Sequence, residues 1–391
     1  MTCDRKTVNQ RRIDPVDAAS HEAEAPASAP MEVTLAEMLI RAVKDSPLTL
    51  MWLPWWGLGG KAALRQRLVQ RDHLGAAGAF SAAWHAPAEG LRLLEIVSAL
   101  RVQHWSKNLL VAVPAIAGQR LLEAGVPLRL AALFAGFSFC ASALYLLNDL
   151  ADLDADRRHP VKRMRPVAGG RLKPGVALAL AGLLAAAGLL LVFAAVRPAL
   201  LPLITYLAAG AAYSLYLKPL VLVDVFVLTG LYLLRLAAGH TVSEIAVSPW
   251  LFALAFFLLF SLALCKRAAE LIRAPVGQTV AHTGRGYRPA DLDMVKSLGC
   301  CCGVCAALVL AIYTQSPHVH SLYAEPAFLL PGSPLLLLWI SRMWLLVQRG
   351  RMEGDPLNFA LRDRFTYVML VCGLLLLILA RKGWIHIPMI G

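Results

Sequence analysis

The sequence has few charged residues. Asp, Glu, Lys and Arg make up only 16% of its 391 residues, whereas 58% are hydrophobic and the mean hydropathy is +0.60. Soluble domains average about 25% charged residues. This shortage of charge excludes an ordinary soluble fold and favours an all-α integral membrane protein, provided that the apolar runs are long enough to cross a bilayer.

The apolar runs are long enough for most crossings, since a transmembrane helix needs about 20 residues. The candidate spans are residues 106–119, 127–147, 175–196, 199–217, 220–239, 248–265, 296–314, 327–347 and 365–380. The first is short, and Pro331 and Pro334 interrupt the eighth. Irregular segments of this kind are tolerated where protein rather than lipid surrounds them. We therefore expect nine transmembrane helices.

Acidic residues are also scarce relative to basic ones, with 25 against 38 and a net charge of +13. The basic residues gather in the connections after the second, fourth, sixth and eighth spans: Arg157, Arg158, Lys162, Arg163, Arg165, Arg171, Lys173, Lys218, Lys266, Arg267, Arg273, Arg285, Arg288, Arg349, Arg351, Arg362 and Arg364. The opposite connections carry little beyond Arg120, Arg129 and Arg197. By the positive-inside rule the first set is cytoplasmic, in a multi-pass protein of the inner (plasma) membrane. The surplus thus reports topology and does not indicate a nucleic-acid partner.

The eight cysteines do not resemble a disulfide framework. Four of them lie in GCCCGVC, near the expected cytoplasmic start of the seventh span, where thiols stay reduced. Cys302 and Cys305 form a CxxC pair that could bind a metal or act in redox chemistry, but packing of small residues between helices is the favoured interpretation. The two histidines of HVH, at 318–320, are a weak metal signal without a third ligand.

The first 90 residues differ from the rest. Residues 1–30 are polar and rich in Ala, Glu and Pro, which predicts a disordered tail without a signal peptide. Residues 31–90 are expected to be helical, with a tryptophan-rich apolar run suited to the membrane interface. Ala36–Leu68 resembles a helical piece of haloacid-dehalogenase-like phosphatase domains, but the DxDGT nucleophile motif is absent, so we expect no phosphatase activity. The membrane domain is expected over 91–391.

A group of acids stands at the cytoplasmic end of the second span. Asn148, Asp149, Asp152 and Asp156 form NDxxDxxxD, and in a continuous helix Asn148, Asp152 and Asp156 share one face. Clustered carboxylates repel one another and oppose the helix dipole at a C-terminus, which argues against a merely solvated helix end. Hard oxygen ligands suit Mg²⁺ and the phosphates of a substrate, with Mn²⁺ as an alternative. We assign the three aspartates to catalysis and all four residues to metal binding.

Basic residues follow the acids directly. Lys162 and Arg165 flank the acidic segment and could compensate the charge of a metal-bound diphosphate. Their alternative role is topology alone, which is the favoured interpretation for Arg171 and Lys173.

These motifs resemble the UbiA superfamily of intramembrane prenyltransferases, and in particular its polyprenyl-phosphate phosphoribosyltransferases. The resemblance rests on LRVQHWSKNLLVAVP from Leu100, YLLNDLADLDADRRHPVKRMRPVAGG from Tyr145, AAYSLYLKPLVLVDVFVLTGLYLLRLAAG from Ala211, SPWLFALAFFLLFSLALCKRAAEL from Ser248 and DPLNFALRDR from Asp355. It implies a cytoplasm-facing cavity where Mg²⁺, phosphoribosyl pyrophosphate (PRPP) and a polyprenyl phosphate such as decaprenyl phosphate meet. The substrate-binding residues it implies are Lys107, Asn108, Tyr145, Lys162, Arg165, Tyr213, Lys218, Asp224, Lys266, Arg267 and Glu270. Oligomerisation is left open.

One motif of the wider superfamily is missing. Aromatic prenyltransferases carry a second acidic motif between the sixth and seventh spans, where this sequence reads CKRAAELIR, with Lys266, Arg267 and a single acid, Glu270. A basic motif suits a lone lipid phosphate beside a metal-bound pyrophosphate, although Lys266 and Glu270 also fit a plain helix pair and Lys218 could be a snorkelling lysine. The alternatives are transfer of a prenyl group to an aromatic acceptor and a non-enzymatic transporter.

Overall fold

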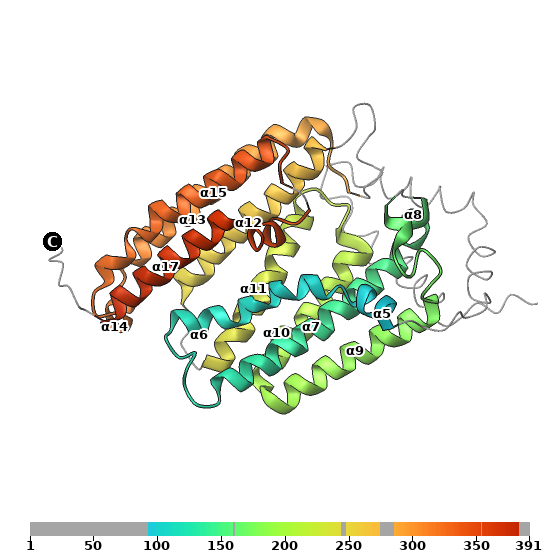
Figure 1. Cartoon of the computed structure of the whole chain (residues 1–391), viewed down its shortest axis with the longest axis horizontal. Helices are drawn as coiled ribbons and strands as arrows, with labels where there is room; N and C mark the ends of the chain where they lie inside the picture. The colour runs from blue at the N-terminus through green and yellow to red at the C-terminus, as the bar shows by residue number, and fades with distance from the viewer. Residues whose placement is uncertain (1–92, 159–160, 244–247, 274–284, 353, 383–391) are drawn as a thin grey trace, which may run out of the picture. The chain divides into compact units, whose positions relative to one another are not determined.

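The computed structural model of the protein describes residues 93–158, 161–243, 248–273, 285–352 and 354–382 (Figure 1). The segments expected over 1–30 and 31–90 lie outside the described residues. Among the described residues, every regular element is a helix. The elements are α5 (Leu93–Leu100), η2 (Val102–Ala112), α6 (Val113–Ala117), α7 (Val126–Ala151), α8 (Leu153–Arg158), η3 (Lys162–Met164), α9 (Pro174–Ala195), η4 (Arg197–Ala199), α10 (Leu200–Ala212), η5 (Tyr213–Leu217), α11 (Val223–Ser243), α12 (Pro249–Ile272), η7 (Pro289–Asp291), α13 (Leu292–Tyr313), α14 (Pro317–Leu322), η8 (Pro326–Leu329), α15 (Gly332–Gln348), α16 (Pro356–Ala360) and α17 (Arg364–Lys382).

Eight helical segments among the described residues are long and apolar enough to cross a membrane. They are Val126–Ala151, Pro174–Ala195, Arg197–Leu217, Val223–Ser243, Pro249–Ile272, Pro289–Tyr313, Pro326–Gln348 and Arg364–Arg381. They correspond to the second to ninth expected spans, and the protein is therefore an all-helical, multi-pass membrane protein. The break expected in the eighth span is present, because the 3-10 turn η8 precedes Pro331 and α15 begins only at Gly332.

The first expected span, 106–119, differs from the other eight. It is the 3-10 helix η2 followed by the short helix α6, which has Pro114 in its first turn. A 3-10 helix rises about 2.0 Å per residue, so η2 is about 22 Å long, and α6 adds about 7.5 Å. Together they are about as long as the hydrocarbon core of a bilayer is thick, roughly 30 Å. A ninth crossing stays a prediction.

The apolar core is divided between two sets of helices. One core cluster joins η2, α7, α9, α10 and α11 through residues such as Phe137 and Leu203. The other joins α12, α13 and α15 through residues such as Leu264, Cys302 and Met343, with Val225 from α11. Helix α11 therefore packs against both sets, and Cys302 has the packing role that the sequence favoured. In Figure 1, α12, α13 and α15 run side by side.

One close backbone approach in the first set joins α7 to α9. A Cβ atom at Gly188 would lie 2.7 Å from the Gly136 carbonyl oxygen and 2.7 Å from Cys140 Sγ. Such distances are too short for nonbonded atoms, so only glycine fits there. Small residues commonly allow this close packing between membrane helices. This contact fixes α9 against the helix whose end carries the acidic motif.

The close contact between α7 and α9 predicts opposite effects on stability when two glycines of α9 are replaced by alanine. Gly188→Ala should destabilise the fold by about 1–3 kcal/mol, because the added methyl group forces the helices apart. Gly182→Ala is the matched control, since its Cβ would meet nothing within 4 Å and alanine favours a helix by up to about 1 kcal/mol. Thermal unfolding of the detergent-solubilised protein measures both. Equal melting temperatures for the two variants would contradict the close packing.

Candidate active site

The acidic motif lies where α7 ends and α8 begins. Asp152 forms the C-cap of α7, and the helical path continues through two backbone bonds, from Asp152 N–H to the Asn148 carbonyl at 2.9 Å and from Asp156 N–H to the Asp152 carbonyl at 2.8 Å. The four polar side chains consequently remain on one short stretch of nearly continuous helix. They divide into two pairs by the cations that they contact.

Asp149 and Asp156 form the first pair. They are seven residues apart, about two helical turns, so they project from the same side. Arg165 Nη1 bridges them, lying 3.2 Å from Asp149 Oδ1 and 2.5 Å from Asp156 Oδ2. Arg101 Nη2 approaches the same Asp149 oxygen at 2.5 Å. Both carboxylates are almost fully buried, so these cations are needed to compensate their negative charge.

Asn148 and Asp152 form the second pair. Lys218, at the end of η5, makes an ion pair with Asp152 and donates to Asn148 Oδ1 at 3.5 Å. The face expected for Asn148, Asp152 and Asp156 stays a prediction, while their contacts divide them between two sets of cations. Asp156 lies on the side of Asp149, as the seven-residue spacing predicts for a nearly continuous helix, and Arg165 contacts both carboxylates.

Arg101 was not found by sequence reasoning. It occupies the left-handed region (φ 52°, ψ 48°) between α5 and η2, a conformation that L residues rarely adopt outside sites where the surroundings enforce it. Its guanidinium also lies 5.1 Å from the ring centre of Tyr145. Its signals in the sequence were its place in the LRVQHWSKNLLVAVP motif and a positive charge shortly before the first apolar run.

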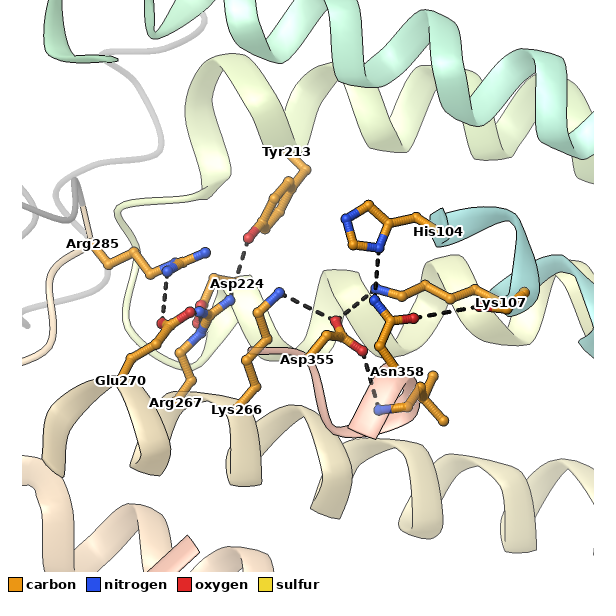
Figure 2. Close-up of polar contacts among 12 residues, drawn as sticks. His104, Lys107, Tyr213, Asp224, Lys266, Arg267, Glu270, Arg285, Asp355 and Asn358 are labelled. Carbon is orange, nitrogen blue, oxygen red and sulfur yellow. Dashed lines mark hydrogen bonds and ion pairs between the residues drawn. The ribbon is translucent and has the colours of Figure 1, made fainter. Parts of the chain in front are cut away.

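A second cluster surrounds Arg267 on α12 (Figure 2). Arg267 Nε contacts Asp224 Oδ2 at 2.6 Å, and its Nη1 contacts Glu270 Oε2 at 2.5 Å. Arg285 contacts that same Glu270 oxygen at 2.6 Å. The Arg267 and Asp224 side chains are 1% and 0% exposed, so their charges can be buried only together.

Tyr287 completes the environment of Asp224. Its hydroxyl donates to Asp224 Oδ1 at 2.7 Å and accepts from the Leu222 N–H at 3.0 Å. Burial, together with the neighbouring Asp224 carboxylate, raises the pKa of Tyr287, so the hydroxyl keeps the proton that it donates. Leu222 has a left-handed backbone (φ 66°), which marks this turn as a second strained position beside the cluster.

The π-helix η5 links these two clusters. Arg267 Nη2 donates to the Tyr213 hydroxyl oxygen at 3.4 Å at the start of η5, and Lys218 binds Asp152 directly after its end. Single π turns inside longer helices are frequent at functional sites. The acidic motif and the α12 motif, more than 100 residues apart in sequence, therefore belong to one region.

A third cluster consists of Lys107, Asp355 and Lys266 (Figure 2). Asp355 Oδ2 lies 2.6 Å from Lys107 Nζ and 3.4 Å from Lys266 Nζ. Burial alone would raise the pKa of Asp355, but the two ammonium groups and the Leu357 N–H hold it well below its usual range. The helix pair that Lys266 and Glu270 could form is not made, since Glu270 pairs with Arg267 and Arg285.

Residues 111–369 match the profile of the UbiA prenyltransferase family. The protein belongs to this family. Curated relatives include the uncharacterized protein y4nM of Sinorhizobium fredii, 33% identical over 283 residues, which are 72% of this chain and 55% of y4nM. Another is the decaprenyl-phosphate phosphoribosyltransferase of Mycobacterium tuberculosis, 33% identical over 69% of this chain and 88% of the relative. A third is the nodulation protein NoeC of Azorhizobium caulinodans, 33% identical over 73% and 93%. The chain thus spans about half the length of y4nM and most of the other two.

Among solved structures, a UbiA homolog from Archaeoglobus fulgidus bound to GPP and Mg²⁺ is similar in fold. It has a TM-score of 0.56 and 16% identity, over 72% of this chain and 99% of that structure. At this identity the likeness concerns the fold alone, and it agrees with the helical architecture of the UbiA-family protein described here.

The predicted site residues of this UbiA-family protein mostly fall in the three clusters. Tyr145 lies beside them, with its ring centre 5.4 Å from that of His104. Lys162 lies in η3, where burial lowers its pKa and the Asp156 carboxylate opposes that shift. Besides Arg101, sequence reasoning did not assign His104, Arg285, Tyr287 or Asn358 to the site. These residues lie outside the long apolar runs, so no periodic pattern predicts their folded positions.

Asn108 lies in a different environment. It is fully buried, its Oδ1 accepts from Arg235 Nε at 2.7 Å, and its Nδ2 donates to Ser138 Oγ at 3.0 Å. Arg235 also donates to the Tyr206 hydroxyl at 2.9 Å. This network binds η2 to α7, α10 and α11, and it gives Asn108 a packing contact. Its role in substrate binding stays a prediction.

The acidic motif has a donor set that fits a hard cation. Among the described residues, no three His, Cys, Asp or Glu side chains are already arranged around a common metal position. Arginine and lysine groups instead neutralise the acids. However, Asp149 Oδ2 is buried and accepts no hydrogen bond within the described part of the chain. A buried carboxylate oxygen without a donor is costly unless it has a ligand, and Asn148, Asp152 and Asp156 supply further oxygens of the kind that Mg²⁺ prefers.

The buried Arg267–Asp224 pair predicts a strong effect on stability. Arg267→Met should destabilise the protein by about 3–5 kcal/mol, because it leaves Asp224 buried without its cation. The double variant Arg267→Met/Asp224→Asn should recover part of that loss, since no buried charge remains uncompensated. Thermal unfolding in detergent measures both variants. A double variant no more stable than Arg267→Met would show that this charge pairing does not control stability.

Proposed function

We propose that the protein transfers the 5-phosphoribosyl group of PRPP to a long-chain polyprenyl phosphate of the decaprenyl phosphate type, releasing pyrophosphate. The observation that carries the proposal is the charge of the α12 motif. Where an aromatic prenyltransferase would need a second acidic motif, this chain presents Lys266 and Arg267. The names of its mycobacterial relatives support the same reaction.

The cation arrangement suits two phosphorylated substrates. Arg101, Arg165 and Lys218 surround the acidic motif, and Lys107 and Lys266 lie in the third cluster. The first three can compensate the charge of a pyrophosphate beside the acids. The two lysines can hold a phosphate at a separate position. Positioning and charge compensation of this kind supply much of the rate in phosphate chemistry.

Asn148, Asp149, Asp152 and Asp156 would hold Mg²⁺, which when bound neutralises pyrophosphate charge and favours its departure. The bond between the ribose C1 and the pyrophosphate oxygen breaks, and a bond between C1 and an oxygen of the lipid phosphate forms. That oxygen is already anionic at neutral pH, so no side chain has to remove a proton. Attack opposite the leaving group inverts C1.

The proposed reaction places the protein in the inner membrane with its site facing the cytoplasm. The distribution of basic residues supports this orientation, and PRPP would then enter from water while the polyprenyl chain stays in lipid. The product, a lipid-linked phosphoribose, would serve the synthesis of lipid-linked arabinofuranose donors and cell-envelope glycans.

The direct test supplies purified protein with PRPP, Mg²⁺ and a radiolabelled polyprenyl phosphate. We expect pyrophosphate release and a lipid-linked phosphoribose. The competing activity is tested in parallel with geranylgeranyl diphosphate and an aromatic acceptor. Turnover of that pair without any ribosylated lipid would reject the proposal in favour of a prenyltransferase.

Asp152→Asn should lower phosphoribosyl transfer by roughly 100-fold or more, because it removes a carboxylate from the proposed metal and pyrophosphate site. Asp154→Asn is the matched control: it makes the same change two residues away, at an exposed position of α8. Initial rates at saturating PRPP measure both variants. A similar loss in both would point to a general effect of helix charge.

Metal binding is tested separately from activity. Mn²⁺ titrated into the protein and followed by electron paramagnetic resonance should show a bound ion, and Asp149→Asn should weaken its binding by about tenfold or more. EDTA should stop phosphoribosyl transfer, and Mg²⁺ should restore it. Unchanged Mn²⁺ binding in Asp149→Asn and Asp152→Asn would show that the acidic motif is not the metal site.

A further inference from the structure

The cluster of Lys107, Asp355 and Lys266 joins three segments that are far apart in sequence. Lys107 comes from η2, Lys266 from α12, and Asp355 precedes α16 (Figure 2). The Lys107, Asp355 and Lys266 side chains are 10%, 9% and 27% exposed. The cluster is largely shielded from solvent, and a ligand can reach it from the side of Lys266.

The charge of the cluster is incompletely balanced. Two ammonium groups converge on a single carboxylate oxygen, Asp355 Oδ2. One carboxylate neutralises only one of them, so the cluster has a surplus of one positive charge. Lys107 Nζ also lies 6.0 Å from the ring centre of Tyr232, whose π face provides only a weak attraction. A buried surplus of positive charge favours an anionic ligand.

The position of Asp355 Oδ2 indicates the size of that ligand. Asp355 Oδ2 lies within contact distance of both lysine ammonium groups. One phosphate oxygen in the same region could likewise contact both ammonium groups. A phosphate monoester carries between one and two negative charges at neutral pH. It would therefore balance the surplus charge, whereas a diphosphate would bring excess negative charge against the Asp355 carboxylate.

We propose that Lys107 and Lys266 form a subsite for a phosphate monoester, and that Asp355 is the specificity-determining residue that disfavours a diphosphate there. The proposal rests on the proposed function for the source of the monoester, which is either the lipid acceptor or the 5-phosphate of PRPP. The proposal explains how a protein that holds pyrophosphate at its acidic motif excludes a diphosphate from the subsite of Lys107 and Lys266.

The segment around Asp355 is held independently of its charge. Asn358 contacts His104 Nδ1 at 2.9 Å, and Ser106 donates to Asn358 Oδ1 at 3.4 Å. Asp355 Oδ1 accepts from the Leu357 N–H at 3.2 Å as the N-cap of α16. Asparagine caps helices as well as aspartate does. Asp355→Asn should therefore remove the charge and leave α16 in place.

The test measures binding to the full chain in detergent by isothermal titration calorimetry, with EDTA present to suppress diphosphate binding at the acidic motif. The probes are farnesyl phosphate, ribose 5-phosphate and farnesyl diphosphate, with farnesol to measure the contribution of the tail. We expect the wild type to prefer farnesyl phosphate over farnesyl diphosphate. Asp355→Asn should lower this preference at least about tenfold by strengthening diphosphate binding, since a unit charge at such short range is worth that much in a partly buried site.

Two variants serve as controls. Asp355→Glu keeps the charge and should keep the wild-type preference. Asp363→Asn makes the same chemical change in the same connection, where Asp363 pairs with Arg342, and should also keep the preference. Lys266→Met provides an independent test should Asp355→Asn not fold, because it should weaken binding of the monoester about tenfold or more. A preference that is the same in Asp355→Asn and the wild type, or monoester binding unaffected by Lys266→Met, would overturn the proposal.

The source of the monoester is identified by the probe whose binding Lys266→Met weakens. Sensitivity of farnesyl phosphate to Lys266→Met assigns the subsite to the lipid, and sensitivity of ribose 5-phosphate assigns it to the soluble donor. Because binding is measured without turnover, the subsite can stand even where the phosphoribosyl transfer assay fails. In that case the proposed function is rejected and the subsite is kept.

Discussion

Burying a carboxylate inside an apolar helix bundle is costly unless a cation lies against it, and this constraint organises the site. Asp149, Asp156 and Asp224 are almost completely buried, and each contacts an arginine. The partners come from different segments: Arg101 is 48 residues from Asp149, and Lys107 is 248 residues from Asp355. The ion pairs therefore do more than neutralise charge, because they hold η2, α7, α12 and α16 at one end of the helices.

The same contacts would suit the phosphorylated ligands of the proposed reaction. Arg101, Arg165 and Lys218 contact carboxylates that a metal-bound pyrophosphate could replace as their partner in the proposed reaction. The acids and bases position one another, so little reorganisation would be needed if a ligand brought charge to them. Two of the three left-handed non-glycine residues in the described part of the chain, Arg101 and Leu222, lie beside these clusters, as expected where a backbone is constrained to aim polar groups.

Sequence reasoning predicted the long helices well and the site less completely. Runs of apolar residues specify a membrane helix locally, because every backbone group must be paired within the segment. The eight later spans followed directly from that rule. The short 3-10 helix η2 did not, because its sequence is compatible with an α-helix and its geometry depends on packing against α7 and α11. The acidic motif was recognised by its spacing, whereas Arg101, Arg285 and Tyr287 occur without a pattern.

The sequence by itself determined the membrane-spanning architecture, the concentration of basic residues on one side and the presence of an acidic motif opposite a basic one. These are properties of local composition and spacing. Only the tertiary structure decided the pairing: that Arg165 bridges Asp149 and Asp156, that Arg267 binds Asp224, and that Lys107 and Lys266 share Asp355. The reason is that a charge in a low-dielectric interior takes the nearest available counterion. Which counterion is nearest depends on how distant helices pack.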